Sequence, residues 1–213
     1  MLVIASENGG IGLPAAMEVL RRGGSALDAV EAGIRCVESN AEDHSVGLGG
    51  LPNLLGEVEL DASIMDGATL RTGAVAAVRG YEHPISIARQ VMERLPYVLL
   101  VGEGAELFAA ECGLERRELA TAESLRIWQE QLERILSPAL FARLVRRQGM
   151  VEATQALVED VNRRHGTTNL IAIDRQGNIA SGVSTSGLGF KYPGRVGDSP
   201  IIGAGNYADN RYG

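Results

Sequence analysis

The sequence has few aromatic residues and few cysteines. Phe, Trp and Tyr make up 4% of its 213 residues, and the two cysteines are Cys36 and Cys112. Each cysteine lies in a stretch with helical periodicity, so we expect buried free thiols and no disulfide framework. The scarcity of aromatic rings argues against an aromatic binding face, whereas the 27 glycines indicate tight turns and close backbone packing.

Positive charge and long apolar runs are lacking as well. The net charge of −7 and the pI of about 5.1 argue against a nucleic-acid or anionic-membrane partner. The longest apolar runs, such as residues 97–101, are too short to span a bilayer. The first ten residues have neither the basic region nor the extended apolar core of a signal peptide. We therefore expect a cytoplasmic protein.

The periodicity of apolar residues predicts an alternation of helices and strands. Helices are expected over residues 15–22, 26–38, 84–95, 105–112, 124–147 and 151–164. Strands are expected over residues 2–5, 57–64, 74–78, 170–173 and 179–183, with a further short strand after residue 95. The alternation in residues 57–64 is typical of a half-buried strand, and the last two strands flank a hairpin turn. Two sets of antiparallel strands with helices between them predict a layered α+β sandwich.

Thr167 stands at a predicted helix-to-strand junction. A threonine hydroxyl is a poor nucleophile unless a base takes its proton, and an N-terminal threonine can use its own α-amine, with a pKa of roughly 7.7–8.0. This solution requires the Thr167 hydroxyl to attack the Gly166 carbonyl, giving an ester that water opens. Taken alone, Thr167 and Thr168 are more simply explained as two β-forming residues that begin a strand.

Two loops near the end of the chain carry further polar groups. Residues 184–187, Ser-Thr-Ser-Gly, offer hydroxyls that can hydrogen-bond a nucleophile, with Gly187 allowing close approach of the backbone. Arg195 and Asp198 suit an amino-acid head group, because arginine binds a carboxylate bidentately and aspartate binds an ammonium. The alternatives are an ordinary Ser/Thr-rich loop and a surface ion pair that contributes little.

Longer segments carry a family resemblance. The sequence of residues 165–210 reads HGTTNLIAIDRQGNIASGVSTSGLGFKYPGRVGDSPIIGAGNYADN, and it resembles the threonine-nucleophile glycosylasparaginases, a family shared with the isoaspartyl peptidase/L-asparaginases. Upstream segments resemble the family too, namely GGSALDAVEAGIRCVE, SVGLGGLPNLLGEVELDASIMDG and HPISIARQVMERLPYVLLVGEGAELFA. The similarity covers most of the chain, more weakly over residues 115–160. Several motifs recur in the same order, which makes the resemblance specific.

This resemblance implies a fold and a subunit organisation. The fold is the four-layer αββα sandwich of N-terminal-nucleophile hydrolases, an α+β class, formed here by one domain over residues 1–213. Residues 1–166 would be the α subunit and residues 167–213 the start of the β subunit. The family assembles as dimers of αβ units and needs no cofactor or metal for its chemistry, so we expect a homodimer without either.

The resemblance also assigns roles to site residues. His165, Gly166 and Thr167 form the autoprocessing segment, with Thr167 as the nucleophile. Thr185 matches the threonine that hydrogen-bonds and helps to activate this nucleophile. Two further residues, Arg195 and Asp198, match those that hold the α-carboxylate and the α-ammonium of the substrate. The implied substrate is a small amino-acid amide, in which Thr167 attacks the side-chain carbonyl of an asparagine-like molecule and water then hydrolyses the aspartyl ester.

The sequence departs from the family pattern in three places. The scission point, usually His-Asp-Thr, reads His165-Gly166-Thr167 here, and Thr168-Asn169 replaces an apolar residue followed by glycine. Near the first strand, Ser6 supplies one hydroxyl where glycosylasparaginases have Ser-Thr-Trp, but the tryptophan that lines the pocket is absent. The Thr-Gly pair that forms the family's oxyanion hole lies beyond the last matching motif, so we expect the chain to be truncated at its C-terminus.

Three functional hypotheses follow from these residues. The first is a self-processing amidohydrolase nearest to N4-(β-N-acetylglucosaminyl)-L-asparaginase, because the SVGLGG segment and the residues after it favour that branch. The second is an L-asparaginase or isoaspartyl dipeptidase. The third, motivated by Gly166, is an uncleaved and inactive family member that acts as a dimerising module. The glycine-rich loop at residues 45–50 lacks a following Lys-Ser/Thr, so it predicts a tight turn rather than a phosphate site.

Overall fold

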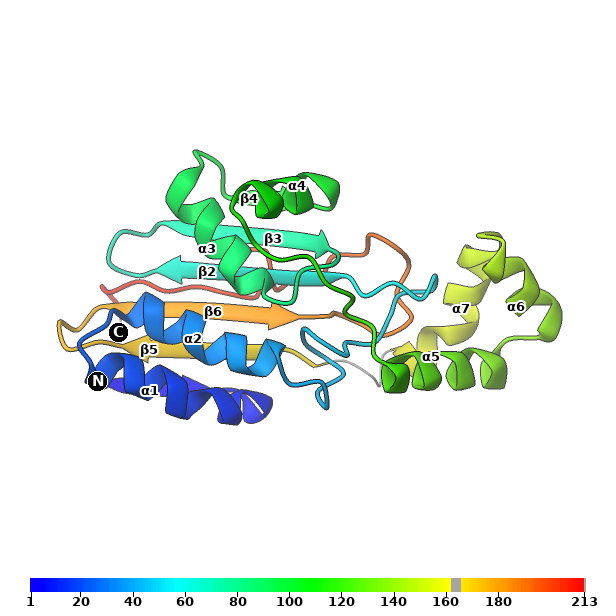
Figure 1. The fold of residues 1–213 in the computed structure, drawn as a ribbon, viewed down its shortest axis with the longest axis horizontal. Helices are drawn as coiled ribbons and strands as arrows, with labels where there is room; N and C mark the ends of the chain where they lie inside the picture. The colour runs from blue at the N-terminus through cyan, green and yellow to red at the C-terminus, as the bar shows by residue number, and fades with distance from the viewer. Residues whose placement is uncertain (162–165, 213) are drawn as a thin grey trace.

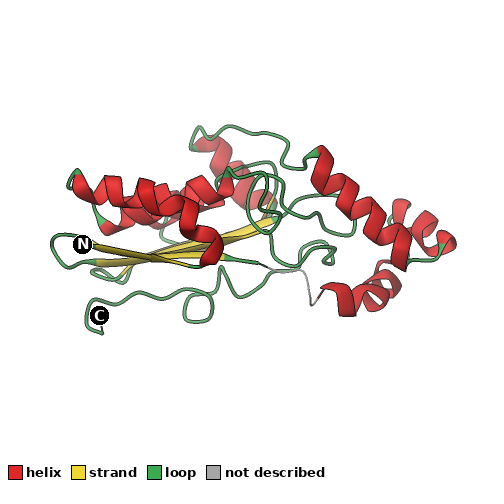
Figure 2. Ribbon diagram, turned by 90° about the horizontal axis from the view of Figure 1, so that it is seen from below, coloured by secondary structure: helices red, strands yellow, loops and turns green. Residues whose placement is uncertain are grey.

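The computed structural model describes residues 1–161 and 166–212 and has a six-stranded sheet with helices packed on one face (Figures 1 and 2). Its strands are β1 (Leu2–Ala5), β2 (Leu60–Asp66), β3 (Thr72–Val78), β4 (Leu99–Val101), β5 (Thr168–Ile173) and β6 (Ile179–Thr185). Its α-helices are α1 (Leu13–Arg21), α2 (Ala26–Glu38), α3 (Pro84–Arg94), α4 (Glu103–Glu111), α5 (Ala122–Ile135), α6 (Pro138–Val145) and α7 (Met150–Val161). A 3₁₀ helix, η1 (Glu7–Gly12), follows β1. The mixed α/β architecture agrees with the expected α+β class.

The two sets of antiparallel strands predicted from the sequence form two hairpins that lie side by side in this single sheet. The strand order is β1-β5-β6-β2-β3-β4, and β5–β6 and β2–β3 are both antiparallel. Strands β6 and β2 join the two hairpins antiparallel to one another, whereas β3 and β4 are parallel. Strands β6 and β2, which are far apart in the sequence, therefore meet in the centre of the sheet, and β1 forms one edge.

Local signals explain where the first two helices begin. Pro14 occupies the first turn of α1, where its missing N–H costs no hydrogen bond. Helix α2 begins with a capping box, in which the Ser25 side chain accepts from the backbone N–H of Asp28 and the Asp28 side chain accepts from that of Ser25. The predicted ranges 15–22 and 26–38 agree closely with these helices.

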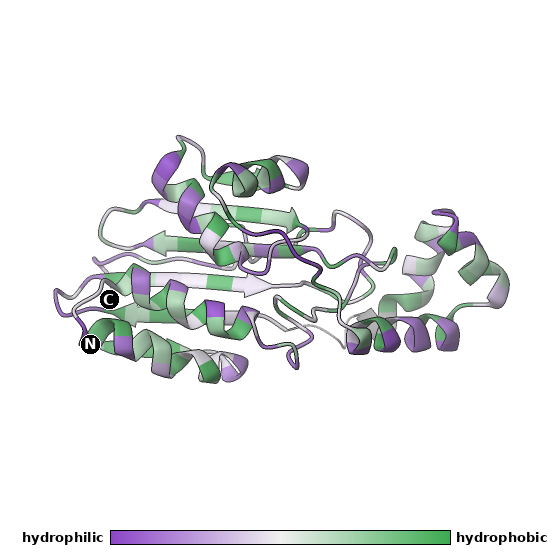
Figure 3. Cartoon of the chain, viewed as in Figure 1, coloured by the Kyte–Doolittle hydropathy of each residue, from purple (hydrophilic) through white to green (hydrophobic). Residues whose placement is uncertain are grey.

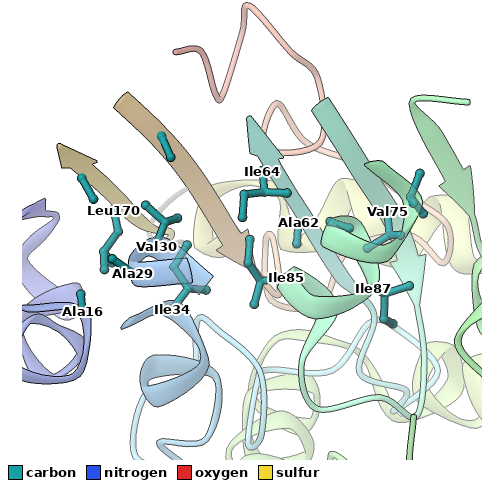
Figure 4. Close-up of a cluster of buried hydrophobic side chains, with 14 of the residues drawn as sticks. Ala16, Ala29, Val30, Ile34, Ala62, Ile64, Val75, Ile85, Ile87 and Leu170 are labelled. Atoms are coloured by element: carbon teal, nitrogen blue, oxygen red, sulfur yellow. The ribbon is translucent and has the colours of Figure 1, made fainter. Parts of the chain in front are cut away.

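The main hydrophobic core lies between the sheet and the helices α1, α2 and α3 (Figure 4). Val30 and Ile34 of α2 face Leu170 of β5, and Ile85 of α3 lies beside them, all fully buried. Helix α2 approaches the sheet closely because β6 has glycine at position 182. A Cβ atom there would lie 2.5 Å from Val30 Cγ1. The absence of that side chain lets α2 pack directly over the middle of β6.

A helical lobe formed by α5, α6 and α7 extends from one end of the sheet (Figure 1). Leu132, Leu140 and Leu157 bury their side chains in its separate core, and hydrophilic residues lie along the outer face of α5 (Figure 3). The expectation of a continuous helix over residues 124–147 is wrong. Ser137 caps a new helix that begins at Pro138, because proline cannot continue the preceding helix.

The strand expected over residues 57–64 is present but begins later, and the expectation that it is half-buried is wrong. The strand β2 runs from Leu60 to Asp66, and its polar side chains Asp61 and Ser63 are fully buried. The C-terminal segment crosses that face of the sheet (Figure 2), and Ser63 Oγ donates to the backbone carbonyl of Ser199 at 2.6 Å. Alternation along this strand therefore separates an apolar face under the helices from a polar face under the C-terminal segment.

Among the helices formed by the described residues, none is both long and apolar enough to cross a membrane.

Candidate active site

The antiparallel register of the β5–β6 hairpin brings Thr167 and Thr185 together. Thr168 pairs with Ser184, so the next pair along the hairpin joins Thr167 and Thr185. Asp61 of β2 lies opposite Thr185 on the other side of β6. Because opposite residues of antiparallel strands project to the same face, these side chains share the face that lies away from the helices.

Thr185 Oγ1 is the centre of the hydrogen bonds at this end of the sheet. It lies 2.7 Å from the carbonyl oxygen of Gly166 and 3.4 Å from Thr167 Oγ1, and it accepts from the backbone N–H of Gly187 at 2.8 Å. A hydroxyl has one proton. The shortest contact assigns that proton to the Gly166 carbonyl, so the Thr167 hydroxyl donates to Thr185 Oγ1. The Gly166–Thr167 peptide bond is thus polarised beside the hydroxyl that would attack it.

The loop after α2 supports this arrangement through Ser45. The backbone carbonyl of Ser45 accepts from the N–H of Ser186 at 2.7 Å. The N–H and the hydroxyl of Ser45 donate to Asp43 Oδ1 at 2.9 and 2.6 Å. Asn8 Nδ2 donates to the other oxygen of Asp43 at 2.9 Å. The segment after β1 is therefore connected to the turn after β6.

Ser6 extends the same network to the beginning of β5, next to Thr167. Its hydroxyl donates to Asn8 Oδ1 at 2.8 Å and accepts from the backbone N–H of Asn169 at 3.0 Å. The hydroxyl that the sequence retains near the first strand therefore packs beside the Thr167 segment.

Glycine at position 166 fits the space that Ser45 leaves. A Cβ atom on Gly166 would lie 2.4 Å from Ser45 Oγ and 2.5 Å from Ser45 Cβ. An aspartate in this place would require Ser45 to move. Of the three predicted autoprocessing residues, Gly166 and Thr167 lie at the site, and His165 lies outside the described residues.

The neighbouring hydroxyls of the 184–186 segment point elsewhere. Ser184 faces the helices and donates to Glu38 Oε1 at 2.7 Å, whereas Ser186 Oγ lies 3.4 Å from the carbonyl of His44. Of the three, only Thr185 contacts Thr167 among the described hydrogen bonds. Side chains alternate between the two faces along β6, so Ser184 projects away from Thr167 and Thr185 projects toward it.

Glu38 is a fully buried carboxyl beneath the site. Its Oε1 accepts from the Ile85 N–H at 3.1 Å as well as from Ser184, and His83 Nδ1 lies 3.2 Å from Oε2. Burial raises the pKa of Glu38, and the hydrogen bonds from His83, Ser184 and Ile85 oppose that rise. Its backbone carbonyl also accepts from Leu48 in the Ser45 loop. Glu38 therefore ties α2 to β6, α3 and that loop.

Arg195 and Asp198 lie in the loop beyond Thr185 and are not paired with each other. Among the described residues, no hydrogen bond or ion pair engages the Arg195 guanidinium or the Asp198 carboxylate. A Cβ atom on Gly187 would lie 3.3 Å from Arg195 Nη1, which brings the guanidinium close to the turn bonded to Thr185. The alternative of a surface ion pair between these two residues is therefore wrong.

Several residues at the site were not predicted from the sequence. Asp43 and Ser45 lie in a loop that was expected only to turn, and Glu59, Asp61 and Lys191 are buried beside the Arg195 loop. The regular placement of Glu59, Asp61 and Ser63 at every second position was the available signal, but it was assigned to a solvent-facing surface. Within the described part of the chain, no group of three or more His, Cys, Asp or Glu side chains is arranged to hold a metal ion.

Comparison with known proteins places the chain in a family. The asparaginase family profile matches residues 12–213. The chain is 44% identical to the N(4)-(β-N-acetylglucosaminyl)-L-asparaginase of Elizabethkingia miricola, over 93% of this chain and 52% of that protein. It is 40% identical to the isoaspartyl peptidase/L-asparaginase of Rattus norvegicus, over 92% of this chain and 54% of that protein. The N(4)-(β-N-acetylglucosaminyl)-L-asparaginase of the same animal is 39% identical, over 93% and 61%.

The protein is thus a mixed α/β protein with two threonine hydroxyls meeting at the end of its central sheet. It belongs to the asparaginase family. The resemblance found in the sequence is confirmed. The chain spans about half the length of the relatives that it matches.

We expect the substitution Glu38→Gln to change how stability depends on pH. A carboxyl whose pKa is raised on folding stabilises the folded state at low pH, and this contribution is lost as the pH rises from the ordinary value of 4.5 through the raised pKa. Glutamine stays neutral, so the unfolding free energy of the variant should rise relative to wild type between pH 5 and 8. Each unit of pKa shift corresponds to about 1.4 kcal/mol. Urea unfolding at pH 5 and at pH 8 measures this difference, with the exposed Glu42→Gln as control. Parallel pH profiles of the unfolding free energy for Glu38→Gln and wild type would contradict the expectation.

Proposed function

We propose that this chain is the precursor of an N-terminal-nucleophile amidohydrolase that cuts itself between Gly166 and Thr167. Residues 1–166 would form the α subunit, and residues 167–213 would begin the β subunit of the same domain. The observation that carries the proposal is the position of Thr185 Oγ1, 2.7 Å from the Gly166 carbonyl oxygen and 3.4 Å from Thr167 Oγ1.

Self-cleavage would begin at this polarised peptide bond. The Thr167 hydroxyl attacks the Gly166 carbonyl carbon, and the Thr185 hydroxyl stabilises the negative charge that develops on the carbonyl oxygen. The proton of the Thr167 hydroxyl passes to the Thr167 nitrogen, the bond from that nitrogen to the Gly166 carbonyl carbon breaks, and the Gly166 acyl group remains as an ester on Thr167 Oγ1. Water hydrolyses this ester, freeing the Gly166 carboxylate and a threonine whose α-amine can act as a base.

The freed threonine would then hydrolyse a β-aspartyl amide. The Thr167 hydroxyl attacks the side-chain carbonyl of an asparagine-like substrate while the α-amine takes the proton of that hydroxyl. The amine then passes this proton to the leaving ammonia or glycosylamine. Water opens the resulting aspartyl ester. Arg195 would bind the α-carboxylate of the substrate and Asp198 its α-ammonium, in agreement with an Arg195 guanidinium that has no protein partner among the described residues.

The preferred substrate is N4-(β-N-acetylglucosaminyl)-L-asparagine. A relative named N(4)-(β-N-acetylglucosaminyl)-L-asparaginase, at 44% identity, supports this choice. The second candidate is an isoaspartyl peptide or asparagine. It is supported by the relative at 40% identity and by the absence, in the segment around Ser6, of the tryptophan that lines the pocket in the glycosylasparaginase branch. We also propose a homodimer of αβ units, as in the sequence-based expectation.

Self-cleavage gives the first test of this function. The intact mass of the purified protein should show two fragments that divide between Gly166 and Thr167, because the polarised bond and its nucleophile are already in place. The variant Thr167→Ala should remain uncut. The matched control Thr168→Val changes the adjacent buried threonine, whose Oγ1 has no hydrogen-bond partner among the described residues, and it should be cut like wild type. A persistent uncut wild-type chain supports the inactive dimerising module instead.

A substrate panel separates the two enzymatic candidates. Ammonia or aspartate release is measured with N-acetylglucosaminyl-asparagine, a β-aspartyl dipeptide and asparagine under the same conditions. The preferred assignment predicts the highest kcat/KM for the glycosylated substrate. Turnover of the dipeptide without turnover of the glycosylated substrate would rule out that assignment and establish the second candidate.

The bare face of the sheet is consistent with the four-layer arrangement. Leu2 and Ile4 of β1 and Ile171 of β5 are exposed on the face away from the helices. Together with Tyr207 they line a hollow of about 350 Å³. We propose that a second sheet packs on this face, which would complete an αββα sandwich.

A charge placed on this face distinguishes a covered surface from a solvated one. Ile171→Lys should lower the unfolding free energy of the full-length protein by about 2 kcal/mol or more, because a covered face would bury an unpaired ammonium. The control Val151→Lys, on the exposed side of α7, should change it by no more than about 0.5 kcal/mol. Equal effects measured by urea unfolding would contradict the layered arrangement.

A further inference from the structure

Three charged side chains are buried beneath the loop that carries Arg195. Glu59 precedes β2, Asp61 lies within it, and Lys191 lies between β6 and the loop. Their exposed fractions are 5%, 0% and 3%. Charged groups are rarely buried to this degree unless their hydrogen bonds are satisfied, so their partners indicate their purpose.

The two carboxylates bind the backbone of the Arg195 loop on both sides of the arginine. Both oxygens of Glu59 accept from the Gly194 N–H at 3.1 Å. Asp61 Oδ2 accepts from the Gly197 N–H at 3.3 Å, and its Oδ1 accepts from the Ala77 N–H at 2.8 Å. The carboxylates are therefore used to fix main chain, and neither forms an ion pair with Arg195.

Lys191 compensates the charge of these carboxylates. Its Nζ donates to the backbone carbonyls of Glu59 and Ser186 at 3.1 Å each. Burial lowers the pKa of Lys191, the negative charges of Asp61 and Glu59 oppose that decrease, and the nearby Arg195 adds to it. The positive charges of Lys191 and Arg195 thus equal in number the negative charges of the two carboxylates. This group lies next to Ser186, which directly follows Thr185.

The Arg195 guanidinium lies close to the turn that follows Thr185. A Cβ atom on Gly187 would lie 3.3 Å from both Arg195 Nη1 and Lys191 Nζ, and one on Gly197 would lie 2.9 Å from Arg195 Nη1. Glycine at both positions lets the guanidinium lie against the backbone. Because Lys191 occupies the neighbouring space, like-charge repulsion disfavours a position of the guanidinium deeper in the protein.

We propose that Glu59 and Asp61 are positioning residues that, with Lys191, hold the Arg195 loop in its binding geometry before substrate arrives. This inference rests on the proposed function, in which Arg195 binds the α-carboxylate of the substrate. A preformed loop avoids the entropic cost of ordering Arg195 on binding, and the partnerless guanidinium is free to form a bidentate pair. Glu59 acts on substrate only through Arg195.

A double-mutant cycle tests this dependence. Glu59→Ala should weaken binding of L-aspartate, the expected product, about tenfold, which is the size of loss typical when a residue that orients a binding group is removed. In an Arg195→Ala background the same substitution should change the dissociation constant less than about twofold. KM for the amide substrate should rise in parallel while kcat stays nearly constant, because the α-carboxylate is held equally in the ground and transition states.

Matched variants keep the test decisive. Glu57→Ala, which removes a half-exposed carboxylate paired with Arg79, should leave aspartate binding unchanged. If Glu59→Ala does not fold, Glu59→Gln enters the same cycle, where it keeps an acceptor for Gly194 and should show a smaller effect that still depends on Arg195. An effect of Glu59 substitution that persists without Arg195 overturns the inference.

Failure of the proposed function and failure of the positioning role of Glu59 give different results. A wild-type protein that turns over no β-aspartyl amide contradicts the function, whereas calorimetric titration with L-aspartate still decides the role of Glu59. Wild-type turnover with unchanged aspartate affinity and KM in Glu59→Ala contradicts the positioning role alone.

Discussion

The hydrogen bond from the Thr185 hydroxyl to the Gly166 carbonyl is the interaction on which the proposed chemistry depends. It is 2.7 Å long, and it places the donor hydroxyl 3.4 Å from the hydroxyl of Thr167. One side chain thereby polarises the bond to be cut and accepts from the group that would cut it. After scission the same hydroxyl would remain beside Thr167, so one contact would serve both self-processing and substrate hydrolysis.

The fold supplies this contact through two constraints on the sheet. The β5–β6 register aligns Thr167 with Thr185, and the β2–β6 register places Asp61 on the other side of Thr185. The C-terminal segment then covers the polar face of β2, which turns Glu59, Asp61 and Ser63 into buried groups that hold backbone. Glu38 performs a related task on the helix face by accepting from Ser184. Buried carboxyl groups therefore lie near the threonine pair on both faces of the sheet, with Glu38 on the helix face and Glu59 and Asp61 on the other.

Local patterns predicted much of the fold but not the environment of the site. The capping box at Ser25 and the turn between β5 and β6 are local signals, so α2 and the hairpin were predicted closely. The burial of Asp61 was missed because alternation in one strand does not reveal which distant segment covers its polar face. The break at Pro138 was missed because helical periodicity continues across it. The proximity of Arg195 to Gly187 depends on Gly187 and Gly197, which are separated in the sequence and meet around the guanidinium only in the fold, so no local pattern encodes it.

The rate of Gly166–Thr167 scission in Thr185 variants tests this account most directly. The measurement follows the appearance of the new N-terminus at Thr167 over time in freshly synthesised protein. Thr185→Val keeps the shape of the side chain and removes the donor, and it should slow scission roughly 10²-fold or more, the loss typical of a missing oxyanion donor. Thr185→Ser keeps the hydroxyl and should be cut at nearly the wild-type rate. Scission of Thr185→Val at the wild-type rate would contradict the account, because Gly166 would then be cleaved without the polarising hydroxyl.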